Sequence, residues 1–195
     1  MSDENFNPDA PLHIRGVNHL AIPVKDRYRA ACFFIAVLGG EAHYESAPDG
    51  AAEGLARSLQ VGVRLAPGFE IDLFEQDYGR PDWNQSHPHL VFDTSAEDLT
   101  KWTESFKKWQ VPFVGPMTRD GTKGVEIYFN DADGNHLEIH CSDVPQAQRE
   151  QFPSGPYDKD LCVHKQEWPP KELADEADQL LQASLARMRQ RRSPR

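Results

Sequence analysis

The feature that most constrains the fold is an internal repeat, because residues 16–141 present the same order of elements twice. The first unit has a strand-like run at 16–25, a helical stretch at 26–38 and three more strand-like runs at 41–45, 57–66 and 68–76. The second unit restarts at 87–94, continues as a helix to Trp109 and has strand-like runs at 111–114, 124–130 and 135–141. Each unit is therefore βαβββ, and a single unit of this size cannot cover its own sheet.

The repeat predicts an α+β fold in which two paired βαβββ modules form a curved mixed sheet around a cavity. We expect the modules at about 15–76 and 86–142, within a domain spanning 14–144. A polar, proline-containing segment at 1–13 is expected to be a flexible tail. Residues 145–195 form a C-terminal extension whose apolar side chains recur at helical spacing over about 171–191.

Two helix boundaries are suggested by the local sequence. Gly39 and Gly40 follow the first helical stretch and suit a left-handed C-terminal cap. In the second unit, Ser95 with Asp98 three residues later resembles a capping box, which predicts a helix that begins next to Ser95.

Strand alternation places four polar residues at related positions of the two units. Successive side chains of a strand face opposite ways, and the helix must cover the more apolar face. This leaves His19 and His89 on the inner face of the first strand of each unit. Asp72 and Glu138 take the same face on the last strand of each unit. Two imidazoles and one or two carboxylates around one cavity predict a divalent-metal site.

The other inward positions suggest groups that act on a substrate. Tyr128 is a candidate proton donor or substrate-orienting hydroxyl. Arg64 either binds an anionic substrate or pairs internally with Asp72 or Glu70, and we favour the internal salt bridge. Asp72 has a shorter side chain than Glu138, so it is either a fourth ligand or a group that hydrogen-bonds to the substrate or a ligand.

These segments resemble the vicinal oxygen chelate superfamily, which includes glyoxalase I, fosfomycin resistance enzymes, bleomycin resistance proteins and extradiol dioxygenases. The resemblance covers residues 15–143 and is carried by VNHLAIPV, HPHLVFD and YFNDADGNHLEIH. The last segment is similar to the family pattern DPDG-x-x-x-E, with Ala132 where proline is usual. The resemblance implies metal ligands at His19, His89 and Glu138, and the fourth ligand of glyoxalase I falls on Asp72.

The resemblance leaves several activities open. Tyr128 is similar to the tyrosine of the extradiol signature, but the histidine expected before it is absent, and His140 or His136 would have to substitute. We expect a metal-dependent enzyme acting on a small vicinally oxygenated substrate, with an Fe²⁺ dioxygenase favoured. Alternatives are a glyoxalase-type lyase or isomerase using Zn²⁺ or Ni²⁺, an Mn²⁺-dependent thiol transferase and a non-catalytic, ligand-sequestering protein. Arg64 and His140 are the candidate substrate-binding residues.

Composition excludes several other classes of protein. The formal net charge of −10 argues against a nucleic-acid partner, since phosphate binding requires a basic face. The sequence contains no apolar run long enough for a membrane span. Three cysteines without a CxxC motif suggest a reducing cytoplasm rather than a disulfide framework. The cavity is expected to form within one chain or across a swapped homodimer, and the sequence does not distinguish these arrangements.

Overall fold

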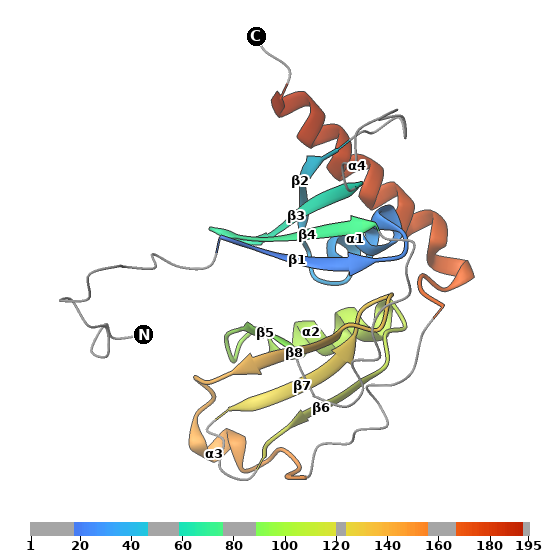
Figure 1. Cartoon of the computed structure of the whole chain (residues 1–195). Helices are drawn as coiled ribbons and strands as arrows, with labels where there is room; N and C mark the ends of the chain where they lie inside the picture. The colour runs from blue at the N-terminus through green and yellow to red at the C-terminus, as the bar shows by residue number, and fades with distance from the viewer. Residues whose placement is uncertain (1–17, 47–58, 76–88, 120–123, 156–166, 193–195) are drawn as a thin grey trace, which may run out of the picture.

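The computed structural model describes residues 18–46, 59–75, 89–119, 124–155 and 167–192 of the 195-residue chain. The tail expected over 1–13, and Cys162, lie outside these ranges. Two modules, each with one sheet and one helix, lie one above the other, and a long C-terminal helix runs beside the first (Figure 1). The first module contains β1 (His19–Val24), α1 (Arg27–Ala36), β2 (Glu41–Glu45), β3 (Gln60–Ala66) and β4 (Phe69–Glu75). The second contains β5 (Leu90–Asp93), α2 (Leu99–Lys108), β6 (Phe113–Met117), β7 (Val125–Asn130) and β8 (His136–Cys141).

The two sheets have the same topology. Their strand orders are β1-β4-β3-β2 and β5-β8-β7-β6, so the first and last strands of each module are neighbours. In both sheets the first and last strands run parallel, and the other neighbours are antiparallel. The predicted α+β fold with two βαβββ modules is confirmed. Each module forms its own hydrogen-bonded sheet of four strands.

Helix α1 begins and ends where its flanking residues satisfy the backbone. The Asp26 side chain accepts hydrogen bonds from the backbone N–H groups of Tyr28 and Arg29 at the first turn. At the other end Gly39 has a φ of 72°, and the Gly39 and Gly40 N–H groups donate to carbonyls of the last turn. The glycine C-terminal cap predicted from the sequence is therefore present, and Phe33 and Phe34 of α1 are buried.

Helix α2 begins later than the sequence predicted. The Ser95 hydroxyl donates to the Asp98 carboxylate at 2.9 Å, and the residues between them form a turn rather than the first turn of a helix. Asp98 is the N-cap, although its side chain makes no capping hydrogen bond. The prediction of Ser95 as the N-cap was wrong because its hydroxyl bonds another side chain instead of a helix N–H.

The C-terminal extension packs mainly on the first module. After the short helix α3 (Gln146–Arg149), a 3-10 turn (Lys171–Leu173) leads into α4 (Ala174–Arg192). Helix α4 lies against α1 and β2, where Leu181, Leu185 and Met188 are buried (Figure 1). No helix among the described residues combines the length and the apolar character that a bilayer-spanning segment needs.

Trp168 joins the extension to both modules. Its side chain is 2% exposed and lies edge-on to Phe33, with ring centroids 5.0 Å apart. The indole N–H donates to the Trp109 carbonyl at the end of α2, at 3.1 Å. The Trp168 carbonyl accepts from the Arg29 Nε of α1 at 2.6 Å, and the same guanidinium donates to the Ala132 carbonyl in the second module. One buried tryptophan therefore links the C-terminal extension to α1 of the first module and to the end of α2 in the second.

Candidate metal centre

The polar faces of β7 and β8 form one continuous surface in the second module. The register of this antiparallel pair opposes Tyr128 with Glu138 and Glu126 with His140. Residues that oppose each other across a ladder project to the same face of a sheet, so these four side chains are neighbours. Glu126 is 3% exposed, Tyr128 2% and Glu138 5%, which makes this a buried polar surface.

The turn before β8 is fixed by a buried aspartate. The Asp131 carboxylate accepts hydrogen bonds from the backbone N–H groups of Asp133 and Asn135, at 2.9 and 2.7 Å. Gly134 has a φ of 82° and its N–H donates to the Asp131 carbonyl. Because this turn sets where β8 begins, it also sets the register that brings Glu138 opposite Tyr128.

His89 and Glu138 form the shortest contact between candidate metal ligands. His89 lies directly before β5, which pairs in parallel with β8. Its Nε2 is 2.9 Å from Glu138 Oε2. Burial raises the pKa of Glu138, the Glu126 carboxylate raises it further, and His89 and His140 oppose the shift. A cation bound beside Glu138 would favour the ionised form of its carboxylate, as a nearby positive charge does.

Glu126, Tyr128 and Arg119 form a chain of hydrogen bonds beside that pair. The Tyr128 hydroxyl donates to Glu126 Oε2 at 2.7 Å and accepts from an Arg119 nitrogen at 3.1 Å. Burial, and then the hydrogen bond to Glu126, raise the pKa of Tyr128 far above its ordinary value. In this arrangement the Tyr128 hydroxyl donates its proton to Glu126 and accepts a hydrogen bond from Arg119, so it holds both side chains in place.

His140 and His136 occupy different surroundings on β8. His140 Nδ1 is 3.5 Å from Glu138 Oε1 and 3.9 Å from Glu126 Oε1. Among the described residues, Glu126, Glu138 and His140 are the group whose ligand atoms all lie within 4.8 Å of one another. The His136 ring stacks on Tyr128 and its Nδ1 lies 3.2 Å from Asn130 Oδ1. Of these two imidazoles, His140 is the one beside the carboxylates.

His19 and Asp72 are located on the other module. Both project to the polar face of the first sheet, where β1 and β4 pair His19 with Glu70 and Ala21 with Asp72. His19 is exposed, and its ring lies 2.8 Å from the Asn18 side chain. Within the part of the chain that the structure describes, neither side chain joins the ligand group of the second module. The four predicted ligands are therefore divided between two sheets of one chain.

Arg64 has an internal partner on the first sheet. Its guanidinium lies 2.6 Å from Glu70 Oε1 and 2.8 Å from His43 Nδ1. Of the alternatives that the sequence left open, the structure contains the salt bridge with Glu70. Arg64 is nevertheless partly exposed, with 45% of its side chain accessible.

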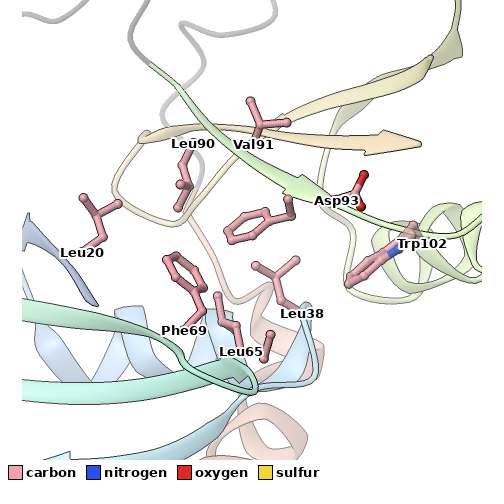
Figure 2. Close-up of a pocket in the computed structure, with 10 residues that line it drawn as sticks. Leu20, Leu38, Leu65, Phe69, Leu90, Val91, Asp93 and Trp102 are labelled. Carbon is pink, nitrogen blue, oxygen red and sulfur yellow. The ribbon is translucent and has the colours of Figure 1, made fainter. Parts of the chain in front are cut away.

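An apolar pocket of about 640 Å³ lies between the two modules and is lined by residues of both. Figure 2 shows Leu20, Leu65 and Phe69 of the first module pointing toward Leu90 of the second. Phe69 and Phe92 approach edge-on across it, with centroids 6.3 Å apart. The polar ligand residues do not line this pocket, so it is not the metal centre.

The donor set of the second module suits a divalent cation. Imidazole nitrogen and carboxylate oxygen are ligands of Mn²⁺, Fe²⁺ and Zn²⁺, and His89 and Glu138 already face each other. Two donors leave the coordination incomplete, since catalytic sites have about three protein ligands. A metal centre built on His89 and Glu138 would therefore require at least one further donor.

Sequence reasoning missed Glu126 and Arg119 as members of this site. Glu126 lies two residues before Tyr128 on the same strand, so both side chains face inward. An acidic residue at an inward position is a signal from which the sequence could have identified Glu126 as a member of the site. Arg119 carries no comparable signal, because it follows β6 and its approach to Tyr128 depends on tertiary structure.

Comparison with known proteins identifies a family and several relatives. Residues 16–139 match the family described as Glyoxalase/Bleomycin resistance protein/Dioxygenase superfamily. The metallothiol transferase FosB of Staphylococcus haemolyticus is 28% identical over 131 residues, which cover 67% of this chain and 86% of FosB. The fosfomycin resistance protein FosX of Listeria innocua is 23% identical, covering 68% of this chain and 94% of FosX.

Solved structures show the same fold. A variant of FosX from Listeria monocytogenes, complexed with Mn(II) and 1S,2S-dihydroxypropylphosphonic acid, has a TM-score of 0.55 and 25% identity. The match covers 70% of this chain and 98% of that one. A glyoxalase/dioxygenase from Nostoc punctiforme has a TM-score of 0.54 and 26% identity, covering 68% of this chain and 94% of its own.

Proposed function

Because this chain belongs to the Glyoxalase/Bleomycin resistance protein/Dioxygenase superfamily, we propose that it is a metal-dependent enzyme acting on a small vicinally oxygenated substrate. The observation that carries the proposal is the 2.9 Å contact between His89 Nε2 and Glu138 Oε2 on a buried polar surface. A bound divalent cation there would polarise two neighbouring substrate oxygens. Fe²⁺, Mn²⁺, Zn²⁺ and Ni²⁺ remain candidates, and the FosX complex with Mn(II) favours Mn²⁺.

The ligands of this proposal are His89 and Glu138 of one chain and His19 of a second copy. His19 is exposed on the first module, away from the second module's ligand group, which supports a donor from outside the chain. Asp72 shares the face of His19 and would enter the same cavity as a fourth donor or a substrate contact. A homodimer with two equivalent centres follows from this arrangement.

The first candidate reaction is opening of an epoxide by a thiol or by water. It is supported by the names of the relatives, which are a metallothiol transferase and a fosfomycin resistance protein. The incoming sulfur or oxygen would form a bond to carbon as the carbon–oxygen bond of the epoxide breaks, and the proton of the thiol or water would end on the released oxygen as a hydroxyl group. Arg119 and the Tyr128 hydroxyl lie where they can orient an anionic group of the substrate. His140 is a further candidate contact at the edge of the cluster.

The second candidate is the dioxygenase predicted from the sequence. Two histidines and one carboxylate form the facial triad of non-haem Fe²⁺ oxygenases, and His19, His89 and Glu138 are the corresponding set. Tyr128 and His140 lie next to Glu138. They would take the places of the tyrosine and the histidine of the extradiol signature that the sequence resembles.

One experiment separates these reactions. The purified protein is loaded anaerobically with Mn²⁺ or Fe²⁺. It is then assayed with fosfomycin plus a low-molecular-weight thiol or water by phosphorus NMR, and with catechols by oxygen uptake. His89→Ala should abolish turnover and weaken metal binding, whereas His43→Ala, an imidazole on the first sheet, should retain both. Tight metal binding by the His89→Ala variant would refute the assignment.

A further inference from the structure

We propose that this chain binds a second divalent cation beside the first, held by Glu126 and His140 and bridged to the first cation by the Glu138 carboxylate. The three side chains lie on the shared inner face of β7 and β8, and Glu126 and His140 oppose each other in the ladder. This site adds to the proposed function and depends on it only through the shared ligand Glu138.

The distances within the group match a coordination sphere. Ligand bonds of about 2.1 Å place neighbouring donor atoms roughly 3 to 4 Å apart around one cation. His140 Nδ1 is 3.5 Å from Glu138 Oε1 and 3.9 Å from Glu126 Oε1, and all three ligand atoms fit within 4.8 Å. A cation can occupy the centre of this triangle with only small rotations of the side chains.

The two oxygens of Glu138 face different donors. Oε2 contacts His89 Nε2 at 2.9 Å, whereas Oε1 faces His140 and the Glu126 side of the cluster. His89 is not a member of the group formed by Glu126, Glu138 and His140. A carboxylate arranged in this way can bridge two cations, which in two-metal sites lie about 3.5–4 Å apart.

The surroundings hold each of these ligands in place. The Tyr128 hydroxyl occupies Glu126 Oε2, which leaves Oε1 directed toward His140. The His140 ring lies over Gly124, where an added Cβ would be 2.3 Å from the ring's Cε1. Glycine at this position therefore provides the space that His140 needs to reach the carboxylates.

Charge also favours a cation at this point. Glu126 and Glu138 are 3% and 5% exposed and lie on neighbouring strands. Arg119 approaches the other side of Glu126, with its Nε 4.0 Å from Oε2 rather than Oε1. Two buried carboxylates therefore meet near His140, and a divalent cation would neutralise both. Two carboxylates and one imidazole suit Mn²⁺, Fe²⁺ or Zn²⁺.

The test is metal stoichiometry of the full-length protein, measured with Mn²⁺ by equilibrium dialysis and elemental analysis. Electron paramagnetic resonance then reports whether the bound ions are magnetically coupled. The wild-type chain should bind two ions per chain with a coupled signal. Glu126→Gln and His140→Ala should each bind one ion with an uncoupled signal, and His19→Ala should lose only the first-site ion. Gly124→Ala should weaken the second ion by displacing the His140 ring.

His136→Ala is the matched control, because it removes an imidazole from the same strand that stacks on Tyr128 but is not one of the ligands, and it should still bind two ions. Circular dichroism establishes that each variant is folded. One ion per chain in the wild type, unchanged in Glu126→Gln, would overturn the second site. Loss of all metal in Glu126→Gln would also overturn it, by placing Glu126 in a single centre. Failure to turn over any substrate would affect the proposed function but not this count.

Discussion

Replacing Trp168 by alanine should cause one of the largest losses of stability available in this chain. The side chain is 2% exposed, packs on Phe33 and Trp109, and donates to the Trp109 carbonyl at 3.1 Å. Truncating a buried tryptophan costs about 3–5 kcal/mol, and the lost hydrogen bond adds about 1 kcal/mol. We therefore expect Trp168→Ala to lower the free energy of unfolding by roughly 4–6 kcal/mol.

The assay is urea unfolding followed by circular dichroism, with the melting temperature as a second measure. For a chain of this length the melting temperature should fall by about 2–4 °C per kcal/mol. Leu180→Ala on α4 is the control, since Leu180 is 39% exposed and the change should stay within about 0.5 kcal/mol. A loss below about 1 kcal/mol for Trp168→Ala would show that this residue does not hold the extension to the modules.

Three further predictions concern other buried groups. Ser184→Ala should cost about 1–3 kcal/mol in urea unfolding, because its hydroxyl accepts the β2 backbone N–H at 2.8 Å; unchanged stability would contradict this. Burial raises the pKa of Asp133 above 3.8, so its stabilising contribution is present below that pH and lost as pH rises through the folded pKa. Asp133→Asn should therefore show a smaller fall in melting temperature between pH 4 and pH 7, and an identical pH profile would refute the reasoning. Burial raises the pKa of Cys32 to about 12 and that of Cys141 to about 11. Both thiols should resist a thiol reagent at pH 8 in a Cys162→Ser background until the protein unfolds, and rapid native-state labelling would count against this.

The repeat and the strand alternation predicted most of the fold because both are local signals. The strand-like runs became β1 to β8 in the predicted order, and the glycine cap ended α1 at the expected position. Alternation also placed Tyr128 and Glu138 on the inner face, since the period-two alternation of side chains depends only on the strand itself.

The relation between the two modules was not accessible from the sequence. His19 and Asp72 lie on the sheet face predicted for them, but that face belongs to the first module and does not meet His89 and Glu138 within the described chain. Alternation fixes which way a side chain points, whereas module packing is determined by tertiary contacts such as those of Trp168. The position of Arg119 beside Tyr128 was missed for the same reason.

Helix α4 determines which sheet edges remain available for association. Its Ser184 hydroxyl accepts the Ala42 N–H of the edge strand β2, and Arg189 pairs with Glu45 on the same strand at 2.8 Å. An unpaired strand edge invites pairing with another chain, and a helix laid along it prevents this. Among the described residues, the edge of the first sheet that α4 does not cover is β1, the strand that carries His19 (Figure 1). The homodimer proposed above would therefore form on the side of the first module that carries His19, its proposed third ligand.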